Sequence, residues 1–212
     1  MALSLHHVFV LTSPDAPGAD ALVELGMVEG SRNTHPGQGT ANRRFFFDDL
    51  YLEFVFFTDV DEARHGPGRV IRSLDRFESP DGSPFGLIFR AETGADLAMF
   101  PSFPYQPEYF EDGTYFSIGD NADRLDEPSC IVLPVILPPA PGVEPRSLAP
   151  FTDVTEVRVS VPAGTPSDVL SRIGDVDRLT LVTGEPHLME ITFGEGTREK
   201  DLRPGLPLIV RW

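Results

Sequence analysis

Two neighbouring segments in the first quarter of the chain predict a β-hairpin whose two faces differ in chemistry. Residues 40–47 (TANRRFFF) and 50–57 (LYLEFVFF) are rich in aromatic and branched side chains. A two-residue turn between them would pair Arg44 with Glu53 and alternate the side chains between faces. One face then carries Asn42, Arg44, Phe46, Tyr51, Glu53 and Val55, which suits a ligand-binding cup better than a core. The other face is almost wholly aromatic and should lie against a helix or another sheet: Phe45, Phe47, Leu52, Phe54 and Phe56.

The segments before this hairpin complete a β-α-β-β-β order. Residues 5–12 (LHHVFVLT) predict a strand, residues 13–26 a helix that ends at Gly26, and residues 27–32 a second strand. The C-terminal residues 151–212 repeat this order as a second, divergent module. Its expected strands and helix are 154–161, 165–174, 178–183, 187–193 and 206–212.

Residues 58–150 differ in composition and connect the two modules. Strands are expected at 86–91, 114–118 and 130–136, and a helix near 67–77. The run 138–145 (PPAPGVEP) is typical of a linker or an extended loop. The whole sequence therefore predicts an α+β fold within a single domain, 1–212, with a first module at 1–57 and a second at 151–212.

Composition and charge narrow the classes of partner. The chain has 33 acidic against 17 basic residues and a net charge of −16, so it offers no basic stripe for nucleic acid and no attraction to an anionic membrane. No apolar run reaches the roughly 18 residues of a membrane span, and the N-terminus lacks the basic region of a signal peptide, so a cytoplasmic protein is expected. Cys130, the single cysteine, excludes an internal disulfide and is expected to be a buried, inert thiol. No glycine pattern indicates a nucleotide cofactor.

The first strand (LHHVFV) and the fourth (YLEFVF), together with the paired β-α-β-β-β order, resemble the vicinal oxygen chelate superfamily. That superfamily includes glyoxalase, bleomycin-resistance proteins and extradiol dioxygenases, and the segment HPGQGTANRRFFFDDLYLEFVF is most similar to its glyoxalase-like members. The resemblance implies two modules that form a curled mixed sheet around a central cup, with helices on the outside. Many members bind a divalent metal in that cup.

The resemblance also assigns roles to individual residues. His7 matches the first-strand metal ligand of the family and Glu53 the fourth-strand ligand, and imidazole with carboxylate suits Zn²⁺, Ni²⁺, Fe²⁺ or Mn²⁺. Glu53 would also be the catalytic residue that moves a proton. We expect the residues that contact substrate to be His35, Asn42, Arg44, Tyr51 and Tyr105.

Other interpretations of these residues remain open. In the second module Glu156 aligns near His7, and the last strand offers no carboxylate where Glu53 would match. Arg44 opposite Glu53 would form a cross-strand ion pair that needs no metal. His35 could serve only the glycine-rich turn, and Tyr105, expected with Tyr109 to cover the cup, could equally pack the irregular middle segment.

These observations support two hypotheses about function and a third, structural one. The first is binding of a small oxygenated metabolite between the modules, with metal-dependent lyase or isomerase chemistry. The second is sequestration of a small aromatic or cationic compound without turnover, as in bleomycin-resistance proteins, and the acidic charge favours a cation. The third is a structural domain whose cup is filled by its own side chains. The protein is expected to be a monomer or a homodimer.

Overall fold

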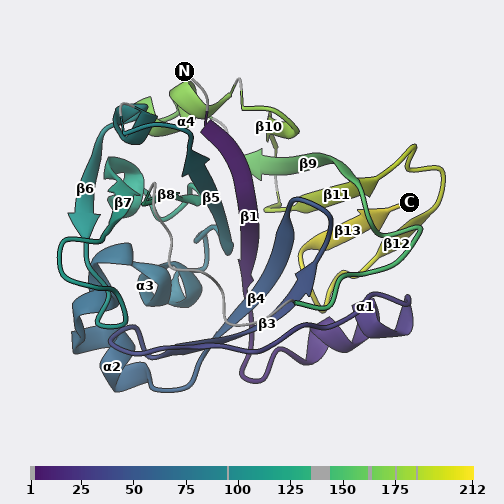
Figure 1. Cartoon of the computed structure of the whole chain (residues 1–212), viewed down its shortest axis with the longest axis horizontal. Helices are drawn as coiled ribbons and strands as arrows, with labels where there is room; N and C mark the ends of the chain where they lie inside the picture. Colours follow the sequence, from purple (N-terminus) through teal and green to yellow (C-terminus); the bar gives the residue numbers. More distant parts are fainter. Residues whose placement is uncertain (1–2, 95, 135–143, 162–163, 175, 185) are drawn as a thin grey trace.

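An eight-stranded curled sheet forms the first two thirds of the protein (Figure 1). A curled mixed sheet is what the family resemblance implies. The computed structural model describes residues 3–94, 96–134, 144–161, 164–174, 176–184 and 186–212. The strands of the sheet are β1 (Leu3–Leu11), β2 (Thr34–His35), β3 (Thr40–Phe46), β4 (Tyr51–Phe57), β5 (Phe85–Ala91), β6 (Ser102–Tyr105), β7 (Phe116–Gly119) and β8 (Ser129–Leu133). They lie in the order β2-β3-β4-β1-β5-β8-β7-β6.

This order contains the same four-stranded arrangement twice. In the first half β1 pairs with β4 in parallel, and β3 and β2 follow antiparallel toward the edge. In the second half β5 pairs with β8 in parallel, and β7 and β6 follow in the same way. The halves join where β1 and β5 run antiparallel. The two halves of the curled sheet are therefore β1–β4 and β5–β8.

The assignment of the second half to residues 151–212 is corrected by this pairing. Those residues form a separate five-stranded sheet in the order β10-β9-β11-β13-β12. The strand that follows the helix there, β10, pairs with β9, the strand before that helix. The corresponding strands of the curled sheet, β2 and β6, pair instead with the strand that follows them, β3 or β7. The elements are β9 (Val154–Val161), α4 (Asp168–Ile173), β10 (Leu179–Thr183), β11 (Met189–Phe193), β12 (Glu199–Asp201) and β13 (Leu208–Arg211).

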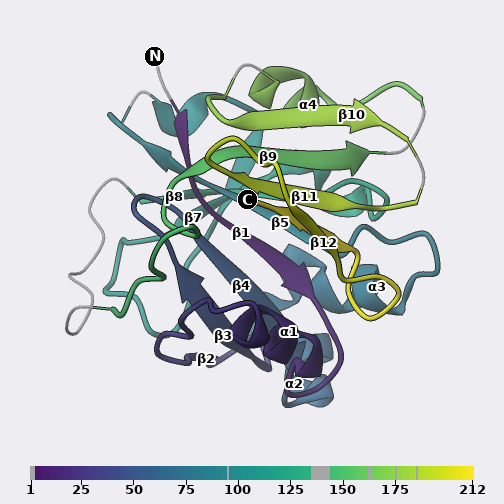
Figure 2. The same ribbon diagram turned by 90° about the vertical axis from the view of Figure 1, so that its right-hand side faces the viewer.

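The predicted register of the β3–β4 hairpin is confirmed, with Arg44 opposite Glu53 and Phe46 opposite Tyr51. The aromatic face of the hairpin shares one hydrophobic core with the five-stranded sheet, as the alternation predicts. The ring centroids of Phe47 and Phe193 lie 4.8 Å apart in this core. Figure 2 shows the five-stranded sheet in front of the curled one. The opposite, mixed face of the hairpin remains available for a site.

The helices are shorter than the sequence suggests. The helix expected over 13–26 begins only at Asp20, because Asp15 and Ala16 have positive φ angles and turn the chain before it. The helices of the first half and of the following connection are α1 (Asp20–Glu24), α2 (Val60–His65) and α3 (Ser73–Glu78), and 3₁₀ helices cover Pro17–Ala19, Pro67–Ile71, Asp96–Ala98 and Asp120–Asp123. No helix of the described ranges is long and apolar enough to cross a membrane.

The remaining predicted elements are found in part. The strands expected at 86–91, 114–118 and 130–136 correspond to β5, β7 and β8, and β6 has no predicted counterpart. The expected strand at 27–32 is replaced by the two-residue β2 and one bridge between Glu29 and Phe45. Residues 138–143 of the expected linker, and the end of the strand expected at 130–136, lie outside the described residues.

Candidate functional site

A cavity of about 240 Å³ lies between the two halves of the curled sheet, on the mixed face of the hairpin. The first half contributes a mostly polar wall: His6, His7, Asn33, His35, Gln38, Thr40, Arg44, Tyr51 and Glu53, with the apolar side chains of Phe9, Val55 and Phe57 beside them. The second half contributes a mostly apolar wall: Ile88, Tyr109, Phe110, Phe116, Ile131 and Leu133. The connection through α2 and α3 adds Ala63, Ile71 and Leu74. The cavity is therefore open space with one polar and one apolar side, which is typical of a site for a small organic ligand.

Glu53 is the one carboxylate among the residues that line this cavity, and it is 7% exposed. Its Oε1 accepts a hydrogen bond of 3.0 Å from Asn42 Nδ2, and its Oε2 lies 3.9 Å from His7 Nε2. Burial raises the pKa of Glu53 to about 7, although the charge of Arg44 and the Asn42 hydrogen bond act in the opposite direction. A carboxyl with this pKa is present in both protonation states near neutral pH, as general acid–base chemistry requires.

A β-bulge brings a second histidine to the same place. The pairing of β1 with β5 shifts by one residue between Leu5 and His7, so His6 and His7 both line the cavity instead of pointing to opposite faces. Their Nδ1 atoms are 2.8 Å apart, and the His7 ring stacks on Tyr51 at a centroid distance of 4.2 Å. Strict alternation along the strand places His6 on the other side, and the only sequence signal for it is the His-His doublet.

The histidines of the cavity are neutral at physiological pH. Burial, with a smaller effect of Arg90, lowers the pKa of His6 to about 4, and burial together with nearby positive groups lowers that of His7 well below its usual value. Burial and Arg44 lower the pKa of His35 to about 4. A neutral imidazole offers one hydrogen-bond donor and one acceptor. The histidines of the polar wall therefore provide hydrogen bonds to oxygen atoms without positive charge.

The glycine-rich turn before β3 places His35 at the rim. Glu62 on α2 accepts hydrogen bonds from the backbone N–H groups of Gly37 (3.0 Å) and Gly39 (2.8 Å). Gly39 has a φ of +66°, and a Cβ there would lie 2.1 Å from the carbonyl oxygen of Asp59, so only glycine fits. With the turn fixed, His35 Nδ1 lies 2.8 Å from Thr40 Oγ1. The histidine serves the turn and also lines the cavity, so both interpretations of it hold.

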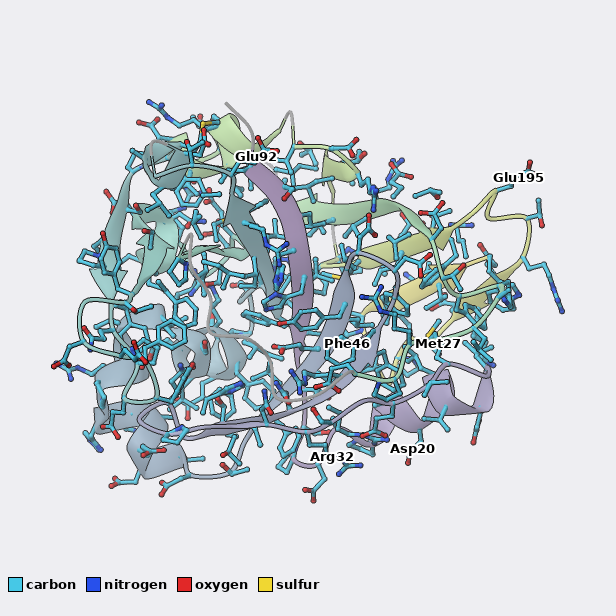
Figure 3. The ribbon with its side chains drawn as sticks, in the orientation of Figure 1. Asp20, Met27, Arg32, Phe46, Glu92 and Glu195 are labelled. Carbon is cyan, nitrogen blue, oxygen red and sulfur yellow. The ribbon has the colours of Figure 1, made fainter. Side chains whose placement is uncertain are left out.

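Arg44 does not pair with Glu53, contrary to the cross-strand ion pair considered from the sequence. Its guanidinium lies 3.1 Å from Glu144, a residue 100 positions away, and donates a 2.8 Å hydrogen bond to the carbonyl oxygen of Ser31. The ring of Phe46, labelled in Figure 3, lies 5.0 Å from the guanidinium carbon and 4.9 Å from the Tyr51 ring. Sequence reasoning missed Glu144 because its contact with Arg44 depends on the long-range fold.

Two of the residues expected to contact substrate have other positions. Asn42 is fully buried beneath the cavity wall, where it holds Glu53 and accepts a 2.8 Å hydrogen bond from the backbone N–H of Asn33. Tyr105 is buried in the smaller hydrophobic core and is not among the cavity-lining residues, which agrees with the packing alternative. Tyr109 does line the cavity, and its hydroxyl accepts a 3.0 Å hydrogen bond from Gln38. His7, His35, Arg44, Tyr51 and Glu53 are brought together as expected.

The strand pairing identifies the positions in the second half that correspond to His7 and Glu53. In the first half, Glu53 pairs with the residue two positions after His7. Ile88 is the cross-strand partner of His7, and Leu133 pairs with the residue two positions after Ile88. Both equivalents are hydrocarbon side chains.

The expected metal site therefore has donor atoms in the first half of the sheet only. Among the described residues, no group of three or more His, Cys, Asp or Glu side chains could hold a metal ion. His7 and Glu53 supply two donors, whereas protein sites for Zn²⁺ use at least three. The donor set of the cavity does not fit the metal that the family resemblance implies. The lone cysteine adds no donor, because Cys130 is buried and burial raises the pKa of its thiol to about 12.

Comparisons with known proteins give a domain and a fold. Residues 5–99 match the glyoxalase-like domain. No curated protein matches the sequence. The structure of a hypothetical protein from Staphylococcus aureus is similar in fold over 99% of this chain and 98% of its own, with a TM-score of 0.58 and 11% identity.

Two enzymes are more distant. Methylmalonyl-CoA epimerase from Streptomyces coelicolor has 13% identity and a TM-score of 0.42, over 62% of this chain and 97% of its own. A 4-hydroxymandelate synthase from the same organism has 13% identity and a TM-score of 0.43, over 98% of this chain and 61% of its own.

Proposed function

We propose that this protein binds a small oxygenated metabolite between the halves of its curled sheet and that Glu53 transfers a proton on it. The match of residues 5–99 to the glyoxalase-like domain and the resemblance to the vicinal oxygen chelate superfamily support the proposal. The observation that carries the proposal is the placement of Glu53 in the cavity wall. One carboxylate oxygen is held by Asn42 and the other faces His7. This arrangement fixes the carboxyl through Oε1, while the residue remains part of the cavity lining.

The two walls indicate the general character of the ligand. Neutral imidazoles and the carboxyl at the polar wall can hydrogen-bond to carbonyl or hydroxyl oxygens. Ile88, Ile131 and Leu133 at the other wall favour a hydrocarbon or aromatic body. A volume of about 240 Å³ is below the usual range for drug-sized ligands, so the ligand is small.

The chemistry that this site supports is proton transfer beside a carbonyl group. In its ionised form Glu53 would accept a proton from the carbon next to a ligand carbonyl. A neutral imidazole of His6 or His7 would donate a hydrogen bond to the carbonyl oxygen as negative charge develops on it. Return of the proton at another position gives an isomerisation, and departure of a neighbouring group gives an elimination. A positioned general base of this kind typically contributes about 10²–10⁴-fold to the rate.

In the part of the chain that the structure describes, the cavity lacks a full set of ligands for the metal-dependent form of this chemistry. The positions that would complete the ligand set, Ile88 and Leu133, bear no donor atoms. The steps are therefore assigned to the chain's own side chains.

Sequestration without turnover is the second candidate, and the largely aliphatic and aromatic second wall favours it. Both candidates need the cavity, but only the enzyme needs the Glu53 carboxyl. A cation as the sequestered compound would meet a single carboxylate in the cavity wall, since Glu53 alone lines it with negative charge among the described residues.

The experiment that separates the candidates follows hydrogen–deuterium exchange beside the carbonyl of small aryl ketones by ¹H NMR in D₂O. The wild-type protein is expected to accelerate exchange of a ketone that it binds. Glu53→Gln should lower the acceleration at least about 100-fold and leave binding largely intact. Glu92→Gln, at an exposed position, is the matched control and should exchange at the wild-type rate. Saturable binding with no acceleration would contradict the enzymatic proposal and support sequestration.

A further inference from the structure

Among the residues that the structure describes, the basic side chains that line the cavity leave no unpaired positive charge for a ligand. The titratable basic side chains that line the cavity are three histidines and Arg44. An imidazole with an ordinary pKa of about 6.5 is mostly uncharged at pH 7.5, whereas a guanidinium stays charged. Arg44 therefore supplies the only full positive charge in this wall.

Glu144 neutralises that charge from outside the sheet. Its Oε1 lies 3.1 Å from Arg44 Nη2 and accepts a 2.5 Å hydrogen bond from Ser31 Oγ, and its Oε2 accepts a 3.0 Å hydrogen bond from the Ser31 backbone N–H. The side chains of Arg44 and Glu144 are only 11% and 18% exposed, so water screens the pair little. Although burial raises the pKa of Glu144, the hydrogen bonds from Ser31 and the charge of Arg44 outweigh it and lower the pKa. The carboxylate is thus ionised at neutral pH.

An anionic ligand would meet no free countercharge in this cavity. It would lose its hydration against Ile88, Ile131 and Leu133 and would lie near the Glu53 carboxyl. To pair with Arg44 it would have to compete for the guanidinium charge with Glu144, which both hydrogen bonds from Ser31 hold in place. A neutral carbonyl or hydroxyl compound has none of these costs.

We propose that the cavity takes an uncharged oxygenated ligand in preference to an anion, and that Glu144 determines this specificity by pairing with Arg44. The inference rests on the proposed function of the cavity and adds the class of ligand and the residue that sets it. Glu144 is a specificity residue here and has no part in proton transfer.

The test uses three probes of nearly equal size: acetophenone, benzoate and benzylamine. Their dissociation constants are measured by NMR titration at pH 7.5 for the wild-type protein, Glu144→Gln, Glu144→Asp and Glu78→Gln. Glu78 forms a matched carboxylate–arginine pair with Arg64 (2.6 Å) outside the cavity, so Glu78→Gln controls for loss of a surface ion pair. Circular dichroism and thermal unfolding confirm that each variant is folded.

The wild-type protein is expected to bind acetophenone at least about tenfold tighter than benzoate. Glu144→Gln should tighten benzoate binding about tenfold, the effect of one charge-assisted hydrogen bond, with acetophenone changed little. Glu144→Asp, which keeps the charge, and Glu78→Gln should both keep the wild-type preference.

Three results would overturn the inference in different ways. Equal or tighter binding of benzoate by the wild type contradicts the exclusion of anions, and tightest binding of benzylamine contradicts an uncharged ligand. An unchanged preference in folded Glu144→Gln contradicts the role of Glu144. Absence of binding by all three probes to every variant contradicts the proposed function itself, which requires the cavity to accept an apolar molecule of this size.

Discussion

The two halves of the curled sheet share a strand arrangement and differ in what they present to the cavity. In β1–β4 the inward side chains include His7 and Glu53, and in β5–β8 the equivalent positions are Ile88 and Leu133. The backbone thus offers the same pair of positions twice, but polar side chains occupy that pair only in the first half. This difference shows that the fold can position a site with polar side chains in one half only. The apolar half then contributes the shape of the cavity and excludes water from it.

The apolar half also changes the chemistry of the polar half. Hydrocarbon opposite Glu53 replaces water that would otherwise solvate its charge, and burial is the largest cause of its raised pKa. The same effect lowers the pKa values of His6 and His35. The contrast between the halves therefore explains why the pKa values of the ionisable groups in the cavity differ from their ordinary values.

The largest expected effect comes from giving the second half the donors that it lacks. Ile88→His with Leu133→Glu would place two donors opposite His7 and Glu53, and the combined set suits Zn²⁺. We expect the double variant to bind Zn²⁺ at least about 100-fold tighter than the wild type, by calorimetric titration and metal analysis.

The matched control is Ile88→Asn with Leu133→Gln, which has similar size and polarity but no strong metal donors. It should bind Zn²⁺ no tighter than the wild type. Stoichiometric, tight Zn²⁺ binding by the wild type would show that the polar half alone suffices, and would contradict the contrast drawn between the halves.

The second effect is a pH-dependent change in stability at Glu53. Its folded pKa of about 7 exceeds the unfolded value of 4.5, so the buried charge costs stability as pH rises from 4.5 through 7. Glu53→Gln removes that cost. We therefore expect the change in the free energy of unfolding that this variant causes to be about 3 kcal/mol more favourable at pH 8 than at pH 4.5. Urea unfolding at both pH values measures the difference. Leu133→Gln, in the apolar half, should instead lower stability by a similar amount at both pH values, by about 1–3 kcal/mol.

The smallest effect concerns the neutral histidines. The folded pKa of His35, about 4, lies below the unfolded value of 6.5, so its contribution to stability is complete above pH 6.5 and is lost as pH falls toward 4. For this partly exposed ring we expect a contribution of about 2 kcal/mol over that range. His35→Gln should flatten the acid limb of the stability–pH curve by this amount. An unchanged acid limb would mean that His35 protonates freely in the folded state.

The local parts of this picture could be predicted from the sequence. The alternation of residues 40–57 gives the hairpin register, its aromatic face and the position of Glu53, because a strand has a period of two and the turn is short. His7 follows from its strand in the same way. The buried state of Cys130 follows from its apolar neighbours.

Long-range pairing could not be predicted. The clean alternation of 154–161 resembles the start of a module, but strand order depends on contacts between distant segments, and β6 and β7 are short strands in a proline-rich region. The bulge at His6 interrupts the two-residue alternation of side chains along β1, so alternation alone gives the wrong direction for the His6 side chain. The Arg44–Glu144 pair joins residues 100 positions apart, so no local spacing indicates it.

A crystal structure of the wild-type protein soaked with acetophenone would show whether the two walls have the roles described. The account predicts the ring against Ile88, Ile131 and Leu133, with the carbonyl oxygen within hydrogen-bond distance of His6, His7 or protonated Glu53. A ring held at the histidine wall with the carbonyl turned toward the aliphatic wall, or a cavity closed by its own side chains with acetophenone bound elsewhere, would contradict it.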